Sequence, residues 1–135
     1  MFYTMKKLFV IIVMVFLASI SIQAQENTVS AQDSIVFENT THDYGTIVQG
    51  SNGNCEFKFV NKGKAPIVLN NVKASCGCTT PEWTRTPVAP GENGIIKVTY
   101  NTNNTGAFSK SVTVNSNAKN STVVLIIKGN VTPKL

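Results

Sequence analysis

The chain has 135 residues and a formal net charge of +5, with 12 basic and 7 acidic side chains. The lysines are spread along the sequence, and no arginine cluster alternates with aromatic residues, so the basic surface typical of nucleic-acid binding is missing. Roughly 110 residues follow the N-terminal segment, which is enough for one hydrophobic core. We therefore expect a single domain that does not bind nucleic acid.

The N-terminal segment, residues 1–24, has the layout of a secretory signal peptide. Lys6 and Lys7 precede an uncharged run from Leu8 to Ile20, and small and polar residues follow up to Ala24. A membrane span needs about 20 apolar residues, and this run has about 13. We expect cleavage after Ala24, no stable membrane insertion afterwards, and export to the periplasm or the extracellular space.

Short β-type runs separated by turn residues follow a polar leader, residues 25–33, which we expect to be flexible. The first strand begins at Ser34 and is expected to continue through a kink at Gly45. Apolar residues alternate cleanly in 54–61, and residues 67–75 predict another strand. Residues 76–93 contain three prolines and two glycines, which favour a long connection.

Three further strands are predicted in 94–102, 108–116 and 121–131. The last of them is apolar on both faces between Val123 and Ile127, so we expect it to be central and covered on both sides. About seven strands and no helix predict an all-β fold, an immunoglobulin-like antiparallel β-sandwich over residues 34–132. The alternation places these residues in the core: Phe57, Phe59, Ile96, Val98, Val112, Leu125 and Ile127.

The order of motifs resembles a known family. HDYG at 42–45, FKFVNKGKAPIVL at 57–69, ASCGCTTPEW at 74–83 and APGENGIIKVTY at 89–100 are followed by NSN at 115–117. This arrangement is similar to the exported bacterial domains called domain of unknown function 1573, and through them to immunoglobulin-like modules of the Hydin and major-sperm-protein kind. The resemblance implies an immunoglobulin-like sandwich, export and no established enzymatic activity. Cys55 lies where the family is not expected to require cysteine.

The CGC segment allows three interpretations. A structural zinc site needs four ligands, whereas the chain offers three thiols and His42, although the close thiol spacing suits copper(I). A redox site is conceivable because Cys-Gly-Cys can close into a labile ring. The favoured interpretation is a structural corner in which Trp83 and the cysteines close one end of the sandwich. The motif residues are Cys76, Gly77, Cys78, Thr79, Pro81, Glu82 and Trp83.

Two disulfide pairings remain open at the sequence level. Cys55 at the start of one predicted strand and the CGC cysteines after the next should lie at the same end of the domain, so Cys55 could bond to Cys76 or Cys78. The thiol left over would then be buried beside Trp83. The rival pairing joins Cys76 to Cys78 and leaves Cys55 free.

The leading functional hypothesis is an exported, non-enzymatic binding or scaffolding module without a cofactor. Immunoglobulin-like sandwiches act through exposed sheet edges and end loops, and the loop from Cys76 to Arg85 is the candidate surface. The expected partner is a protein of the cell envelope, which the sequence does not identify. The alternative is a thiol-redox or copper-handling periplasmic protein that uses the Cys-Gly-Cys motif.

Overall fold

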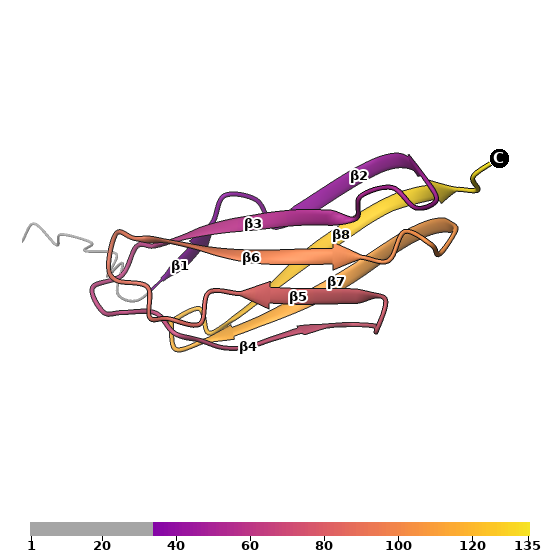
Figure 1. Cartoon of the computed structure of the whole chain (residues 1–135). Coiled ribbons are helices and arrows are strands. Elements are labelled where there is room, and N and C mark those ends of the chain that lie inside the picture. The colour runs from indigo at the N-terminus through magenta and orange to yellow at the C-terminus, as the bar shows by residue number, and fades with distance from the viewer. Residues whose placement is uncertain (1–33) are drawn as a thin grey trace, which may run out of the picture.

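A computed structural model describes residues 34–135, which form two stacked four-stranded sheets (Figure 1). The strands are β1 (Ile35–Phe37), β2 (Thr41–Val48), β3 (Asn54–Asn61), β4 (Leu69–Ala74), β5 (Thr79–Trp83), β6 (Asn93–Tyr100), β7 (Gly106–Ser116) and β8 (Thr122–Thr132). One sheet has the order β1-β3-β6-β5, and the other has the order β2-β8-β7-β4. Within residues 34–135, no helix is long and apolar enough to cross a membrane.

The predicted fold class, an immunoglobulin-like β-sandwich, is confirmed by this topology. All paired strands are antiparallel except β2 and β8, which are parallel. The chain changes sheet at every connection between consecutive strands except β5–β6 and β7–β8. Such sheet changes let both inner faces contribute to one core, as sandwich folds require.

The predicted core is also confirmed. Phe57 and Phe59 of β3 are 2% and 1% exposed, because alternate side chains of this strand point between the sheets. Each of the other five residues predicted for the core is fully buried. The core thus draws on β3 and β6 of one sheet and on β7 and β8 of the other.

The first predicted strand is two strands in different sheets. β1 pairs with β3, and after the exposed residues 38–40 the chain crosses over so that β2 pairs with β8. Sequence periodicity cannot reveal this crossing because both strands keep the extended alternation. The predicted kink at Gly45 is present as a break in the β2–β8 register, with a φ of 65° that favours glycine.

The predicted connection at 76–93 contains a strand that we did not expect. Thr79–Trp83 forms β5 at the edge of the first sheet, paired with β6. Pro81 argued against a strand, since proline cannot donate to a ladder. On an edge strand, however, a proline nitrogen can face away from the neighbouring strand, and Pro81 does so because the even-numbered residues of this segment are the ones bonded to β6.

The last strand is central but not covered on both sides. β8 lies between β2 and β7, and Leu125 and Ile127 are fully buried. Val124 on its opposite face is 48% exposed. The expectation of double cover was therefore wrong, because β8 belongs to a two-layer sandwich in which each sheet has only one covered face.

Candidate functional site

The outer edge of β1 is closed by a side chain. The Ile35 N–H donates to Asn120 Oδ1 at 3.0 Å, and Asn120 Nδ2 donates to the Ile35 carbonyl at 2.8 Å. The amide thus takes the place that a neighbouring strand would occupy. A strand of three residues capped in this way offers little to a partner.

The outer edge of β2 is interrupted instead. Its ladder with β8 breaks between Asp43 and Thr46, and the Gly45 N–H donates to the Asp43 carboxylate at 2.8 Å. A bulge of this kind bends the strand and blunts its edge.

The outer edge of β5 is blocked by proline. The Thr84 N–H donates to the Ile95 carbonyl and the Asn101 N–H donates to the Cys78 carbonyl, so even-numbered residues of this segment face β6. Hydrogen bonding alternates along an antiparallel strand, so Thr79, Pro81 and Trp83 direct their backbone groups outward. Pro81 has no N–H to donate, and the Thr79 N–H already donates to the Cys76 carbonyl at 3.4 Å.

β4 keeps an open edge. The Ser75 N–H donates to the Ser111 carbonyl at 2.9 Å, in register with the pairs Ala74–Val112 and Lys73–Thr113. By the same alternation, the N–H and C=O groups of Val72 and Ala74 point away from β7. The β4–β7 register is irregular between Leu69 and Asn71, but between residues 71 and 74 no proline, bulge or capping side chain from residues 34–135 interrupts β4. We call the outward backbone groups of residues 71–74 the β4 edge.

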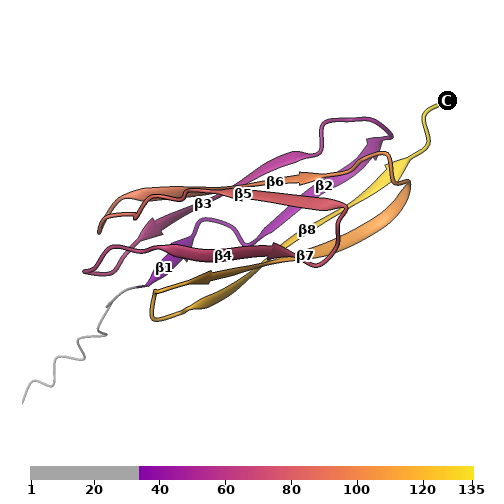
Figure 2. The same cartoon turned by 60° about the horizontal axis from the view of Figure 1, so that its bottom comes forward.

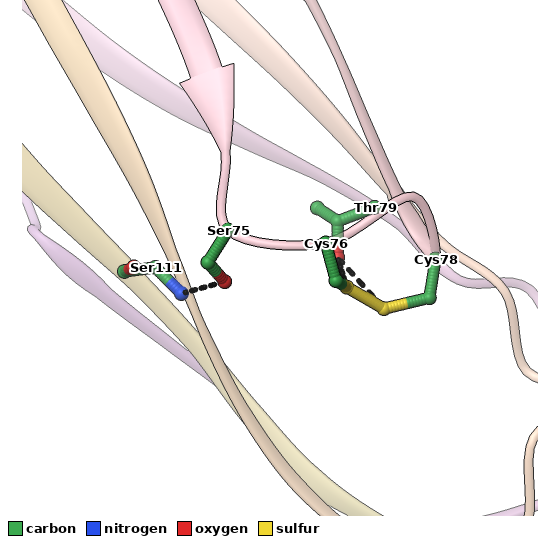
Figure 3. The surroundings of a disulfide bond; sticks show 5 residues. All are labelled: Ser75, Cys76, Cys78, Thr79 and Ser111. Atoms are coloured by element: carbon green, nitrogen blue, oxygen red, sulfur yellow. Dashed lines mark hydrogen bonds between the residues drawn. A yellow bond between two sulfur atoms is a disulfide. The ribbon is translucent and has the colours of Figure 1, made fainter.

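The Cys-Gly-Cys segment joins the β4 edge to β5. Both strands run along the same side of the sandwich but in different sheets (Figures 1 and 2). Cys76 and Cys78 form a disulfide with Cα atoms 5.4 Å apart (Figure 3). Both cysteines are half-buried, and each sulfur lies 3.8 Å from Thr79 Oγ1. We call residues 75–79 the CGC corner.

The chain enters and leaves the CGC corner at fixed points. On the β4 side, Ser75 is bonded to Ser111 through its N–H and through its hydroxyl, which accepts from the Ser111 N–H at 3.2 Å (Figure 3). On the β5 side, the Cys78 carbonyl accepts from the Asn101 N–H at 2.8 Å. The disulfide therefore lies where the chain passes from one sheet to the other.

Of the two disulfide pairings left open by the sequence, the bridge from Cys55 to a CGC cysteine was wrong, and the rival Cys76–Cys78 pairing is confirmed. Cys55 is a buried free thiol in β3, and β6 lies between β3 and β5. Cys55 does lie level with Pro81 across the sheet, since both pair with Val98. Two strand spacings of about 4.8 Å exceed the Cα separation that a disulfide tolerates. Sequence reasoning placed both ends correctly but could not see the intervening strand.

The environment of Cys55 makes this thiol unreactive. Burial raises the pKa of Cys55 above its ordinary value, and burial likewise raises the pKa of Tyr44. The Tyr44 hydroxyl donates to the Gly53 carbonyl at 2.6 Å. A buried thiol that stays protonated is a poor nucleophile, so Cys55 is a structural residue.

Trp83 does not close the end of the sandwich together with the cysteines, as we had expected. It lies at the opposite end of β5 from the CGC corner, half-buried against the core. Arg85 stacks over its ring at 3.6 Å from the centroid. Its indole N–H is buried and has no hydrogen-bond acceptor among residues 34–135. Glu82, which lies between Pro81 and Trp83 in the chain, is exposed and pairs in register with Lys97 of β6.

His42 does not join the cysteines. It lies on β2, with its ring edge-on to Tyr44 at a centroid distance of 4.5 Å. In the part of the chain that the structure describes, no three histidine, cysteine or acidic residues gather into a group that could hold a metal ion.

Sequence reasoning missed a set of structural asparagines. Asn61 is fully buried, and its side chain bonds to the carbonyls of Ala65 and Val88. Asn117 accepts from the Val68 N–H and donates to the Pro66 carbonyl. With Asn120, these residues bind backbone groups at the end of the sandwich away from the CGC corner. The only signal in the sequence was asparagine richness, which does not distinguish such residues from turn residues.

The fold defines an immunoglobulin-like β-sandwich module. The chain belongs to the DUF1573 family of proteins of unknown function, whose sequence pattern matches residues 35–131. This match confirms the resemblance stated from the sequence motifs. No curated protein matches the chain.

Solved structures share this fold at low sequence identity. A protein of unknown function from Porphyromonas gingivalis W83 aligns with a TM-score of 0.65 and 16% identity, covering 79% of this chain and 51% of that one. The chain therefore spans about half of that protein. The human CEP192 ASH/PapD-like domain 7 aligns with a TM-score of 0.65 and 9% sequence identity, covering 87% of this chain and 98% of that one. A chain of the CsuC–CsuE chaperone–tip adhesion subunit complex of Acinetobacter baumannii aligns with a TM-score of 0.52 and 10% sequence identity. The alignment covers 73% of this chain and 57% of that one.

Proposed function

We propose that the protein is an exported, non-enzymatic module that binds an extended segment of a partner protein in the cell envelope along the β4 edge. The observation that carries this proposal is the difference among the four sheet edges. β1 is capped, β2 is bulged and β5 contains an outward-facing proline. β4 is irregular only at its start, between Leu69 and Asn71, and within residues 34–135 the outward backbone groups of Val72 and Ala74 are unpaired. Open edges invite strand addition, and main-chain hydrogen bonds supply the affinity.

The chemistry of β4 indicates what kind of segment would fit. Lys73 is its only charged residue, and the side chain is exposed on the outer face of the sheet. Its register partner Thr113 is uncharged. An added strand that places a carboxylate next to Lys73 gains a favourable cross-strand pair, about 0.2–1 kcal/mol. The partner segment is therefore extended and carries an acidic side chain opposite Lys73.

The fold likeness is consistent with binding of this kind. One of the solved structures that shares the fold is a chaperone in complex with an adhesion subunit. At 10% identity this likeness supports the fold alone, and the assignment of the surface rests on the edges of this chain.

Site-specific photocrosslinking tests the proposal in the envelope of the source cells. A photoreactive amino acid at Asn71, exposed on β4, should capture a partner, whereas the same group at Glu56, exposed on the interior strand β3, should not. Ala74→Pro removes an outward N–H without removing a bond to β7, so the fold should persist and the crosslink should fall at least tenfold. Ala74→Ser keeps the N–H and should crosslink as the unchanged protein does.

Two outcomes contradict the proposal. One is an Asn71 crosslink of unchanged yield in folded Ala74→Pro protein, as judged by circular dichroism. The other is capture from Glu56 in the absence of capture from Asn71.

A further inference from the structure

We infer that the Cys76–Cys78 disulfide is a thiol–disulfide exchange site whose redox state controls the β4 edge, with an external dithiol as its substrate class. The inference rests on the proposed function only for its consequence in binding. Its chemical part stands on the CGC corner alone.

The disulfide is accessible to a small reductant. Both cysteines are only half-buried, and Gly77 between them is exposed. The space around Gly77 is open, since a Cβ added there would meet no atom within 4 Å. An attacking thiolate can therefore approach the ring from the glycine side. Access is one of the conditions that separate exchangeable disulfides from inert ones.

The exchange requires a thiol from outside the chain. Cys55 is the third cysteine, and it is buried, protonated and separated from β5 by β6. A thiolate of the external dithiol attacks one sulfur, which breaks the Cys76–Cys78 bond and forms a mixed disulfide. The second thiol of the reductant then attacks the reductant's own sulfur in this mixed disulfide, which breaks the bond to the protein and releases the second cysteine. The oxidised reductant leaves as a cyclic disulfide. The protein gains two electrons and two protons, and both cysteines become thiols.

The position of the disulfide links this chemistry to the β4 edge. Ser75, which precedes Cys76, makes the last hydrogen bonds that hold β4 to β7. The Cys78 carbonyl is fixed to Asn101 in the facing sheet, so the ring constrains the short crossing between two anchored points. Breaking a covalent constraint increases the freedom of the opened segment and lowers the free energy of local opening. The end of β4 should fray, and the outward N–H of Ala74 should lose its alignment.

The oxidised form is therefore the binding-competent form, and reduction weakens capture of the partner segment. Protection of the Ser75 N–H reports this change directly because that group donates to Ser111.

The test uses the purified exported protein with dithiothreitol as the probe dithiol. Native reduction followed by alkylation and peptide mapping should label Cys76 and Cys78, and Cys55 only after denaturation. Hydrogen exchange at the Ser75 N–H should become at least tenfold faster after reduction, while exchange at the Ile96 N–H, which faces the interior strand β3, should not change. In the double variant Cys76→Ser/Cys78→Ser, hydrogen exchange at the Ser75 N–H should be fast with or without dithiothreitol. In Cys55→Ala, dithiothreitol should accelerate this exchange as it does in the unchanged protein.

The outcomes separate this inference from the proposed function. A disulfide that resists native reduction, or reduction that leaves exchange at Ser75 unchanged, overturns the inference. If Asn71 gives no crosslink in either redox state, the proposed binding edge is wrong. Alkylation and hydrogen exchange at Ser75 still test whether Cys76–Cys78 is a thiol–disulfide exchange site. A crosslink of equal yield in both states overturns the control of binding by the disulfide.

Discussion

At the scale of single residues, the three cysteines differ because of where the fold places them. Cys55 lies in the core near the Tyr44 hydroxyl, and its thiol pKa is raised by burial. Cys76 and Cys78 are half-buried in a crossing between sheets and are bonded to each other. The same side chain is thus a small apolar core residue at one position and a covalent constraint at two others.

The raised pKa of Cys55 predicts a loss of stability in alkaline solution. The folded thiol stays protonated, while the unfolded thiol releases its proton above its ordinary pKa of about 8.5. Stability from this group is complete below that pH and falls above it, with a limiting slope of about 1.4 kcal/mol per pH unit. Urea unfolding at pH 7, 8.5 and 9.5 should show this fall, and Cys55→Ala should flatten it.

Tyr44→Phe is the matched control for that measurement. Burial also raises the pKa of Tyr44, but its contribution declines only above the ordinary tyrosine pKa of about 10. The fall between pH 8.5 and 9.5 should therefore remain in Tyr44→Phe. An equally steep fall in Cys55→Ala would show that another group is responsible.

At the scale of elements, each sheet edge carries its own protection, and β4 carries the least. The cap on β1 is the one that a single substitution removes most cleanly. Asn120 comes from the turn between β7 and β8, so its bonds to Ile35 join the two sheets as well as closing an edge. Loss of both bonds should release β1 without altering the core.

Asn120→Ala should lower the free energy of unfolding by about 1–3 kcal/mol, since each hydrogen bond contributes about 0.5–1.5 kcal/mol. Exchange at the Ile35 N–H should accelerate, because this group loses its acceptor. Asn39→Ala, in the exposed crossing between β1 and β2, is the control and should stay within about 0.5 kcal/mol. Unchanged protection at Ile35 in Asn120→Ala would refute the capping role.

At the scale of the whole molecule, the two sheets enclose one core, and their edge strands lie along its two sides. The side formed by β4 and β5 carries both the proposed binding of a partner segment and the proposed thiol–disulfide exchange. The disulfide at that side fits an exported protein, because disulfides persist in oxidising compartments. Export itself is predicted by residues 1–24, which lie outside the described residues.

The N-terminus of the protein recovered from the envelope or medium checks this prediction. Edman sequencing should begin near Gln25, with Cys76 and Cys78 oxidised in the same material. A variant with Leu8→Arg and Val10→Arg, which breaks the apolar run, should keep residues 1–24 and accumulate inside the cell. Exported protein that still begins at Met1 would contradict the predicted cleavage.

The all-β class, the core of Phe57, Phe59 and their partners, and the kink at Gly45 could all be predicted from the sequence alone. These features follow from local alternation and from the special backbone freedom of glycine, which are properties of neighbouring residues. The family resemblance was equally visible in contiguous motifs.

Which strands share a sheet, and therefore where the candidate site lies, could be seen only in the three-dimensional fold. Whether Thr79–Trp83 is a connection or an edge strand depends on β6 lying beside it, since Pro81 is tolerated only with its nitrogen facing outward. The disulfide pairing depends on the strand that separates Cys55 from β5. Within residues 34–135, β4 pairs with β7 alone, so its other edge is open. Which edges stay open depends on how segments far apart in the chain come together, and no local pattern encodes that.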